Sequence, residues 1–175
     1  MRFTPLIALT AVAAALPAIA IAIPAAAKTE SFRATLDGTA IPTTTGSPAH
    51  GKVTVKVDTK SQRVSVELDV QGITLEQLNK ALVAKPIGPV HFHQYRTADD
   101  VEAVLPVPYG ANYRTTKTGF HVSMRNYSYA EGAKLLNDQD SFEEFVDALN
   151  AGKIVVNIHT EKFPEGEISG KVMPD

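Results

Sequence analysis

The stretch from residue 152 to residue 171 constrains the fold of this chain more than any other. Its first part is dominated by β-branched residues, which favour a buried strand: Ile154, Val155, Val156 and Ile158. Asn157 and His159 interrupt this run two residues apart, so both lie on one face of a regular strand. A turn at residues 164–166 and an alternating segment at 167–172 follow. The pattern predicts a β-hairpin whose polar pair needs partners if it is buried.

A second polar pair lies upstream, in the segment P-V-H-F-H at residues 89–93. His91 and His93 are also two residues apart, so one strand presents both on the same face. Together with His159 they form a candidate three-histidine metal site, because imidazole is a suitable ligand for copper or zinc. The alternative is structural: these side chains form hydrogen bonds across adjacent strands and determine their register.

These segments resemble the CHRD domain, which is named for chordin and also occurs in secreted bacterial proteins. The resemblance rests on N-I-H-T at 157–160, F-P-E-G-E-I-S-G-K at 163–171, H-F-H at 91–93 and F-x-A-x-L-x-G at 32–38. These motifs occur in the order of the family, and the match covers about residues 30–173. Ser169 and Lys171 replace the arginine and glutamine that are usual in the family, so no role of those side chains is carried over.

The resemblance implies a non-enzymatic binding or structural module outside the cytoplasm and no specific ligand. We expect its unknown partner to be an extracytoplasmic protein or glycan. The resemblance also implies a β-barrel similar in shape to the copper–zinc superoxide dismutases, which use an H-x-H strand. The alternative function is therefore copper or zinc binding, with metal-dependent redox activity as the only enzymatic possibility. A bridged copper–zinc pair requires about six histidines and an aspartate, whereas this chain has five scattered histidines.

Alternation of apolar and polar residues predicts further strands at residues 52–58 and 63–70. Capping patterns at Thr74–Gln77 and Ser141–Glu144 predict helices over 74–82 and 141–150, and a third short helix is expected at 129–136. We expect a mainly antiparallel β-sandwich or flattened barrel, immunoglobulin-like or superoxide-dismutase-like. Its seven or eight strands would be connected in part by two or three short helices.

The 175 residues include no cysteine and carry a formal net charge of −2. This excludes disulfides and thiolate sites, and it gives no reason to expect binding to nucleic acid. Residues 1–27 have one basic residue, a long apolar run and an alanine triplet, which indicate a secretory signal peptide cleaved after Ala27. The working protein is then one domain, residues 28–175, secreted or periplasmic and without membrane contact after cleavage.

We find none of the common catalytic motifs, such as G-x-S-x-G or H-E-x-x-H, and we therefore expect no enzyme. The candidate metal ligands are His91, His93 and His159, and Asn157, Thr160 and Glu167 are expected to support them or to be structural. His121 is expected to be solvated, with a fourth-ligand role as the alternative. An adhesion role would instead require an exposed patch of tyrosines: Tyr109, Tyr113, Tyr127 and Tyr129.

Overall fold

The computed structural model describes residues 28–39, 44–97, 100–138 and 140–175. The predicted signal peptide lies outside these residues. Ten strands form one antiparallel sheet in the order β5-β4-β8-β9-β1-β2-β3-β7-β6, and β10 also pairs with β1. The strands are β1 (Thr29–Asp37), β2 (His50–Asp58), β3 (Arg63–Gln71), β4 (Val90–Tyr95), β5 (Val101–Val107), β6 (Tyr113–Thr115), β7 (Gly119–Ser128), β8 (Ile154–Ile158), β9 (Ile168–Lys171) and β10 (Met173–Pro174).

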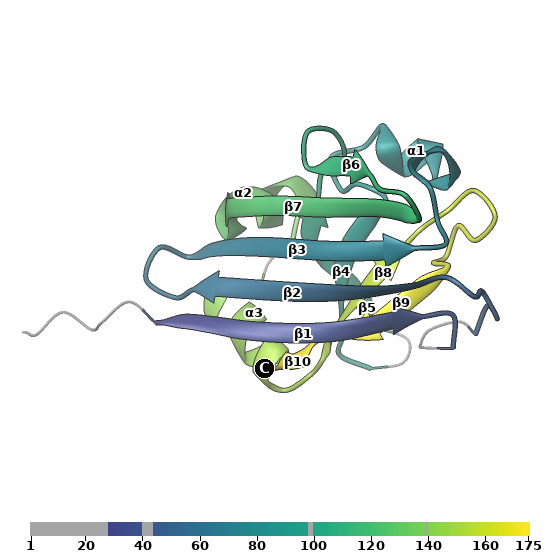
Figure 1. The fold of residues 1–175 in the computed structure, drawn as a ribbon. Helices are drawn as coiled ribbons and strands as arrows, with labels where there is room; N and C mark the ends of the chain where they lie inside the picture. The colour runs from purple at the N-terminus through teal and green to yellow at the C-terminus, as the bar shows by residue number, and fades with distance from the viewer. Residues whose placement is uncertain (1–27, 40–43, 98–99, 139) are drawn as a thin grey trace, which may run out of the picture.

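The sheet curls so that two groups of strands face each other, as in a flattened barrel. Figure 1 shows β1, β2, β3 and β7 in one layer, with β4, β8 and β9 behind them. This confirms the predicted mainly antiparallel β fold, and the predicted hairpin of residues 152–171 is the β8–β9 pair. Strand twist explains the curl, since each strand is rotated relative to its neighbour in the same sense.

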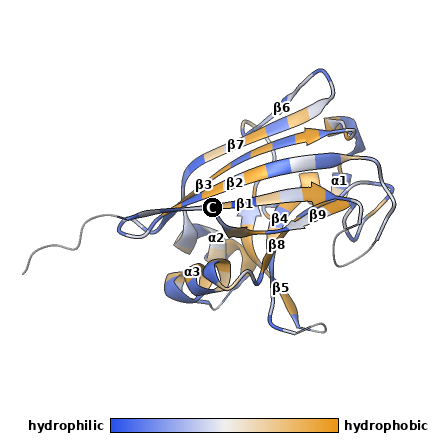
Figure 2. Ribbon diagram, turned by 60° about the horizontal axis from the view of Figure 1, so that its bottom comes forward, coloured by the Kyte–Doolittle hydropathy of each residue, from blue (hydrophilic) through white to orange (hydrophobic). Residues whose placement is uncertain are grey.

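The alternating strands enclose the core. Val53, Val55 and Val57 on β2 are 0–2% exposed, and their polar neighbours lie on the outer face. On β3, Val64, Val66 and Leu68 are each 0% exposed. Figure 2 shows the resulting alternation of hydrophobic and hydrophilic positions along these strands. Full burial of such a side chain stabilises the fold by about 1.5–3 kcal/mol relative to its exposure to water.

Short helices lie in the connections. The helices α2 (Tyr129–Leu136) and α3 (Phe142–Asn150) lie below the sheet in Figure 2, and Phe145 and Leu149 of α3 are fully buried. The predicted capping box of α3 forms, because Ser141 Oγ accepts a hydrogen bond from the Glu144 backbone and Glu144 accepts one from the Ser141 backbone. Within the described ranges, no helix has the length and apolar character needed to cross a bilayer.

The prediction of one helix over residues 74–82 is wrong. The segment contains a 3-10 turn at Leu75–Gln77 and a separate one-turn helix, α1 (Lys80–Val83). Leu78 is extended between them, almost fully buried, and bridges to Thr160 next to the β8–β9 turn. Burial of this leucine and its pairing with Thr160 therefore outweigh the helical preference of the local sequence.

Candidate metal centre

Strands β4 and β8 bring the predicted histidines together. In the antiparallel β4–β8 pair, His91 lies opposite Asn157 and His93 opposite Val155, while Phe92 and Val156 face the core. His159 follows directly after β8, and its backbone N–H donates a hydrogen bond to the Pro89 carbonyl at 2.9 Å. All three histidines therefore lie on the face opposite the core.

The pairing of β4 with β5 is irregular at the point where the two histidines lie. The register shifts between Phe92 and His93, so that Leu105 pairs with Phe92 but Ala103 pairs with His93. The extra residue on β5 is Val104, which is 0% exposed. Bulges of this kind bend a strand and change the direction of its side chains, and they are common next to functional sites.

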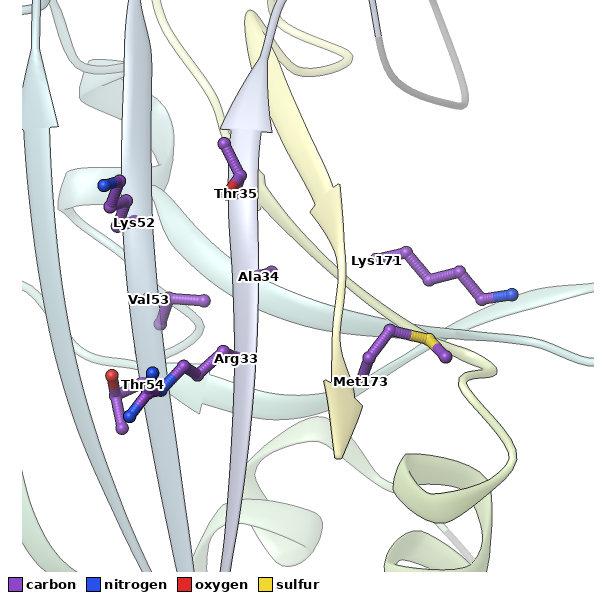
Figure 3. Close-up of a pocket in the computed structure, with 8 residues that line it drawn as sticks. All are labelled: Arg33, Ala34, Thr35, Lys52, Val53, Thr54, Lys171 and Met173. Carbon is purple, nitrogen blue, oxygen red and sulfur yellow. The ribbon is translucent and has the colours of Figure 1, made fainter. Parts of the chain in front are cut away.

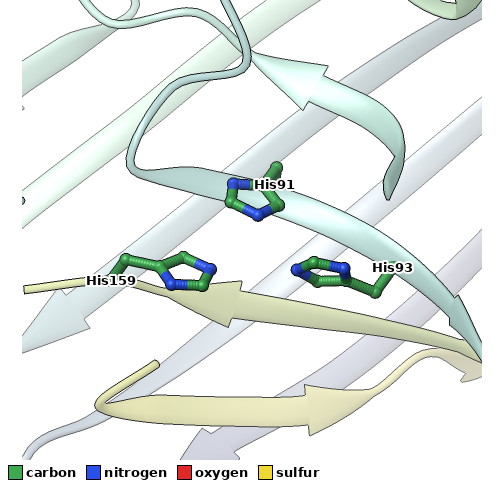
Figure 4. Close-up of side chains that lie close together, drawn as sticks. All are labelled: His91, His93 and His159. Atoms are coloured by element: carbon green, nitrogen blue, oxygen red, sulfur yellow. The ribbon is translucent and has the colours of Figure 1, made fainter. Parts of the chain in front are cut away.

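The three imidazole rings lie around a common space. One ring nitrogen from each of His91, His93 and His159 lies within 4.8 Å of the others. The rings of His91 and His159 are stacked with centroids 4.4 Å apart, and His93 lies 4.6 Å from His91 and 6.0 Å from His159. Figure 4 shows His91 and His93 extending from β4 toward His159, which comes from the other strand. The structure thus brings together all three predicted ligands.

Backbone carbonyls orient two of these rings. His91 Nδ1 lies 3.0 Å from the Gly88 carbonyl oxygen, and His159 Nδ1 lies 2.7 Å from the Pro164 carbonyl oxygen. A carbonyl oxygen can only accept a hydrogen bond, so Nδ1 carries the proton in both rings and Nε2 carries a lone pair. His159 Nε2 and both ring nitrogens of His93 are buried without a partner. This arrangement, a ring fixed through Nδ1 with Nε2 free, is typical of metal-binding histidine.

Burial keeps the three histidines neutral. Burial, together with the nearby His159, lowers the pKa of His91 to about 3 and that of His93 to about 4. The pKa of His159 is also lowered by burial, although its bond to Pro164 and the nearby Glu165 act in the opposite direction. Neutral imidazole is the form that binds metal, so protons do not compete at neutral pH.

The three nitrogens lie farther apart than the ligands of a bound ion. Zinc–nitrogen bonds of about 2.0–2.1 Å place tetrahedral ligands about 3.3 Å apart, which is closer than the 4.8 Å limit of this set. The side chains would have to move closer together for all three to bind one ion. Among the described residues this is the one group of three or more histidine, cysteine or acidic side chains so arranged, so no second cluster is available for a bridged metal pair.

The three supporting residues named from the sequence occupy different places. Asn157 is 2% exposed and lies on the histidine face, opposite His91. Thr160 Oγ1 donates a hydrogen bond to Glu167 Oε2 at 2.7 Å, and Ser47 donates one to Glu167 Oε1 at 2.6 Å. Glu167 therefore ties the chain before β2 to the β8–β9 turn, and its carboxylate is occupied by these hydroxyl groups.

The structure also places His121 and the tyrosines that were considered for an adhesion patch. His121, expected to be solvated, lies on β7 opposite Asp69 of β3 and is half-buried. Its Nδ1 lies 2.7 Å from Asp69 and its Nε2 3.1 Å from Glu67, and it is not part of the histidine cluster. The tyrosine patch does not form, because Tyr113 and Tyr129 are 8% and 2% exposed. Tyr113 was expected at the surface, but its hydroxyl donates to the buried Val107 carbonyl at 2.8 Å.

A hollow of about 530 Å³ lies on the outer face of β1 and β2, beside β10. Figure 3 shows Arg33, Lys52 and Lys171 around it, with Met173 at one side. Arg33 forms an ion pair with Asp175 at 2.8 Å, so two of the three cations are available to a partner. The hollow is open and solvated, unlike the buried histidine cluster.

Sequence reasoning did not identify Gly88 and Pro164, whose carbonyls hold the two imidazoles. The only signal for Gly88 was its position shortly before the H-F-H strand. It adopts a φ of +77°, and a Cβ atom there would lie 2.0 Å from the Val107 carbonyl oxygen. Only glycine therefore allows the chain to enter β4 so close to β5.

Comparison with known proteins gives one finding. The family model of the CHRD domain matches residues 32–172, which include all of the strands from β2 to β9 and the three histidines. No curated protein and no solved structure matches the chain. The motifs quoted from the sequence thus fall within the matched region, in nearly the same bounds. The match spans most of the chain, which therefore belongs to the CHRD domain family.

Proposed function

We propose that this protein is an extracytoplasmic binding module whose ligand is a copper or zinc ion. The ion would be held by Nε2 of His91, Nε2 of His159 and one ring nitrogen of His93. The observation that carries the proposal is the convergence of three imidazoles, one ring nitrogen of each lying within 4.8 Å of the others. Buried polar atoms without partners cost roughly 1–3 kcal/mol each, and a bound ion would remove that cost.

Ligand chemistry supports copper or zinc over other ions. Calcium and magnesium prefer oxygen ligands, whereas imidazole nitrogen suits copper and zinc. The proposed role is binding rather than catalysis, and a redox function of a bound copper ion is the enzymatic alternative. The extracytoplasmic location rests on the signal-peptide pattern of residues 1–27.

The test is metal titration of the purified protein with copper and with zinc, monitored by calorimetry and elemental analysis. We expect one ion per chain. His91→Ala and His159→Ala should each weaken binding by more than roughly 100-fold, since even loss of an outer hydrogen bond to a ligand costs 10- to 100-fold.

His50→Ala and His121→Ala are the matched controls, because both remove a histidine that lies outside the cluster. They should retain wild-type affinity. No uptake by the wild type, or equal losses in the control variants, would overturn the proposal. The search for a ligand would then move to the basic hollow of Figure 3 and to proteins or acidic glycans.

A further inference from the structure

The side chain of Asn157 is buried on the histidine face with its amide oxygen unpaired. The residue is 2% exposed, and Oδ1 has no hydrogen-bond partner. The side chain of Asn157 also acts on the Tyr95 hydroxyl and lowers its pKa, although burial outweighs this effect and raises it. An unpaired amide oxygen at this depth is costly, and its position next to a cluster of free imidazole nitrogens points to a ligand.

Strand register places the side chain of Asn157 beside the histidine cluster. Asn157 is directly opposite His91 and two residues before His159, so it shares a face with both and is diagonal to His93. Side chains directly opposite on antiparallel strands have Cβ atoms about 4.5–5.5 Å apart. A small molecule bound beside the histidines is therefore within reach of the amide.

The turn between β8 and β9 restricts the space above Asn157. A Cβ atom at Gly166 would lie 3.5 Å from Asn157 Nδ2, so the turn packs directly onto the amide. Pro164 in the same turn holds the His159 ring at 2.7 Å. The turn thus covers both the amide and the His159 ring.

The histidine cluster supplies three ligands for a tetrahedral ion. Within the described part of the chain, no acidic side chain joins the three imidazoles as a fourth ligand. Sites with three protein ligands keep the fourth position for water or an exogenous molecule. Water bound to a metal is a strong hydrogen-bond donor and requires an acceptor, which Asn157 Oδ1 provides.

We propose that the metal site has an open position that holds an exchangeable water, and that Asn157 orients this water by accepting its hydrogen bond. The site then takes up small exogenous ligands in place of the water. Asn157 acts as a positioning residue and does not bind the ion. This inference rests on the proposed metal site.

The test uses the cobalt(II)-loaded protein, whose visible spectrum reports on coordination, titrated with sodium azide. Azide should replace the water and change the spectrum of the wild type. Asn157→Leu should bind cobalt with affinity close to that of the wild type. It should bind azide roughly 5- to 20-fold more tightly, because the water that azide displaces has lost one hydrogen bond.

Gln94→Leu is the matched control. Like Asn157, Gln94 on β4 has a buried side-chain amide with an unpaired oxygen. Because it directly follows His93 on the strand, its side chain lies on the face opposite the histidines. Its substitution should leave azide affinity unchanged, and circular dichroism of both metal-free variants should show the wild-type fold.

Four other outcomes of the cobalt and azide titrations would contradict the proposal or the metal site on which it rests. A spectrum insensitive to azide in the wild type would overturn the open position. Equal azide affinity in the wild type and Asn157→Leu would overturn the role of Asn157. A loss of cobalt affinity in Asn157→Leu beyond roughly 100-fold exceeds the effect of an outer hydrogen bond. It would show that the amide itself ligates the ion, which also overturns the proposal. Failure of the wild type to bind any metal would instead refute the metal site.

Discussion

At the scale of single residues, the buried histidines link folding to pH. His91 and His93 have pKa values of about 3 and about 4, well below the value near 6.5 of an exposed imidazole. At pH values between the folded and the unfolded pKa, the unfolded chain binds protons that the folded protein does not. The free energy of unfolding therefore falls as the pH falls through this range. The contribution is fully present above pH 6.5 and decreases progressively toward pH 4.

We therefore expect the metal-free protein to lose up to about 2 kcal/mol of unfolding free energy for each of these two histidines between pH 7 and pH 5. Urea denaturation at a series of pH values measures this slope. His93→Leu should reduce the slope, because it removes one of the two buried imidazoles. Identical slopes in the wild type and His93→Leu would contradict the prediction.

At the scale of elements, the segment that leads into β4 controls the position of His91. Gly88 supplies the carbonyl that accepts the hydrogen bond of His91 Nδ1. A Cβ atom at Gly88 would lie 2.0 Å from the Val107 carbonyl oxygen. Gly88→Ala should lower the unfolding free energy by more than roughly 2–3 kcal/mol, since strain and a backbone clash combine. It should also weaken metal binding, which a competition titration would measure.

Gly46→Ala is the natural comparison for that change. Gly46 also has a positive φ, +67°, but a Cβ atom there would lie in open space. Its substitution should cost only about 1 kcal/mol and leave metal affinity unchanged. If both alanine variants behave alike, the contact with Val107 has no role in shaping the site.

Several elements could be predicted from the sequence for a clear physical reason. Alternation marks β2 and β3 because one face of each is buried, and the capping box marks α3 because its hydrogen bonds are local. The strand β6 and the break at Leu78 could not be predicted, since both depend on contacts outside the local sequence.

For the site, the spacing of His91 and His93 indicated a shared face. The carbonyls of Gly88 and Pro164 carry no side-chain signature, so their roles became visible only in the structure.

At the scale of the whole molecule, one core supports the histidine cluster. The strands β4 and β8 present the histidines on one face and Phe92, Val156 and Ile158, each 0% exposed, on the other. A ligand that binds only the folded state therefore stabilises the entire domain.

Zinc at 100 times its dissociation constant should raise the unfolding free energy by about 2.7 kcal/mol. For a domain of this size that corresponds to an increase in Tm of roughly 5–11 °C. Differential scanning calorimetry with and without zinc measures the shift, and His93→Ala should abolish it. A similar increase in Tm for that variant would show that zinc binds elsewhere.

The histidines of the cluster come from two segments that are distant in the sequence, which bears on the order of folding and metal binding. His91 and His93 leave the ribosome long before His159, and two imidazoles alone are a weak chelate. The third joins them only when β8 pairs with β4. With the proposed metal site, insertion of the ion would follow folding, and the ion would not act as a template for it. The compartment in which the finished protein resides, rather than the one in which it is synthesised, would decide which ion it carries.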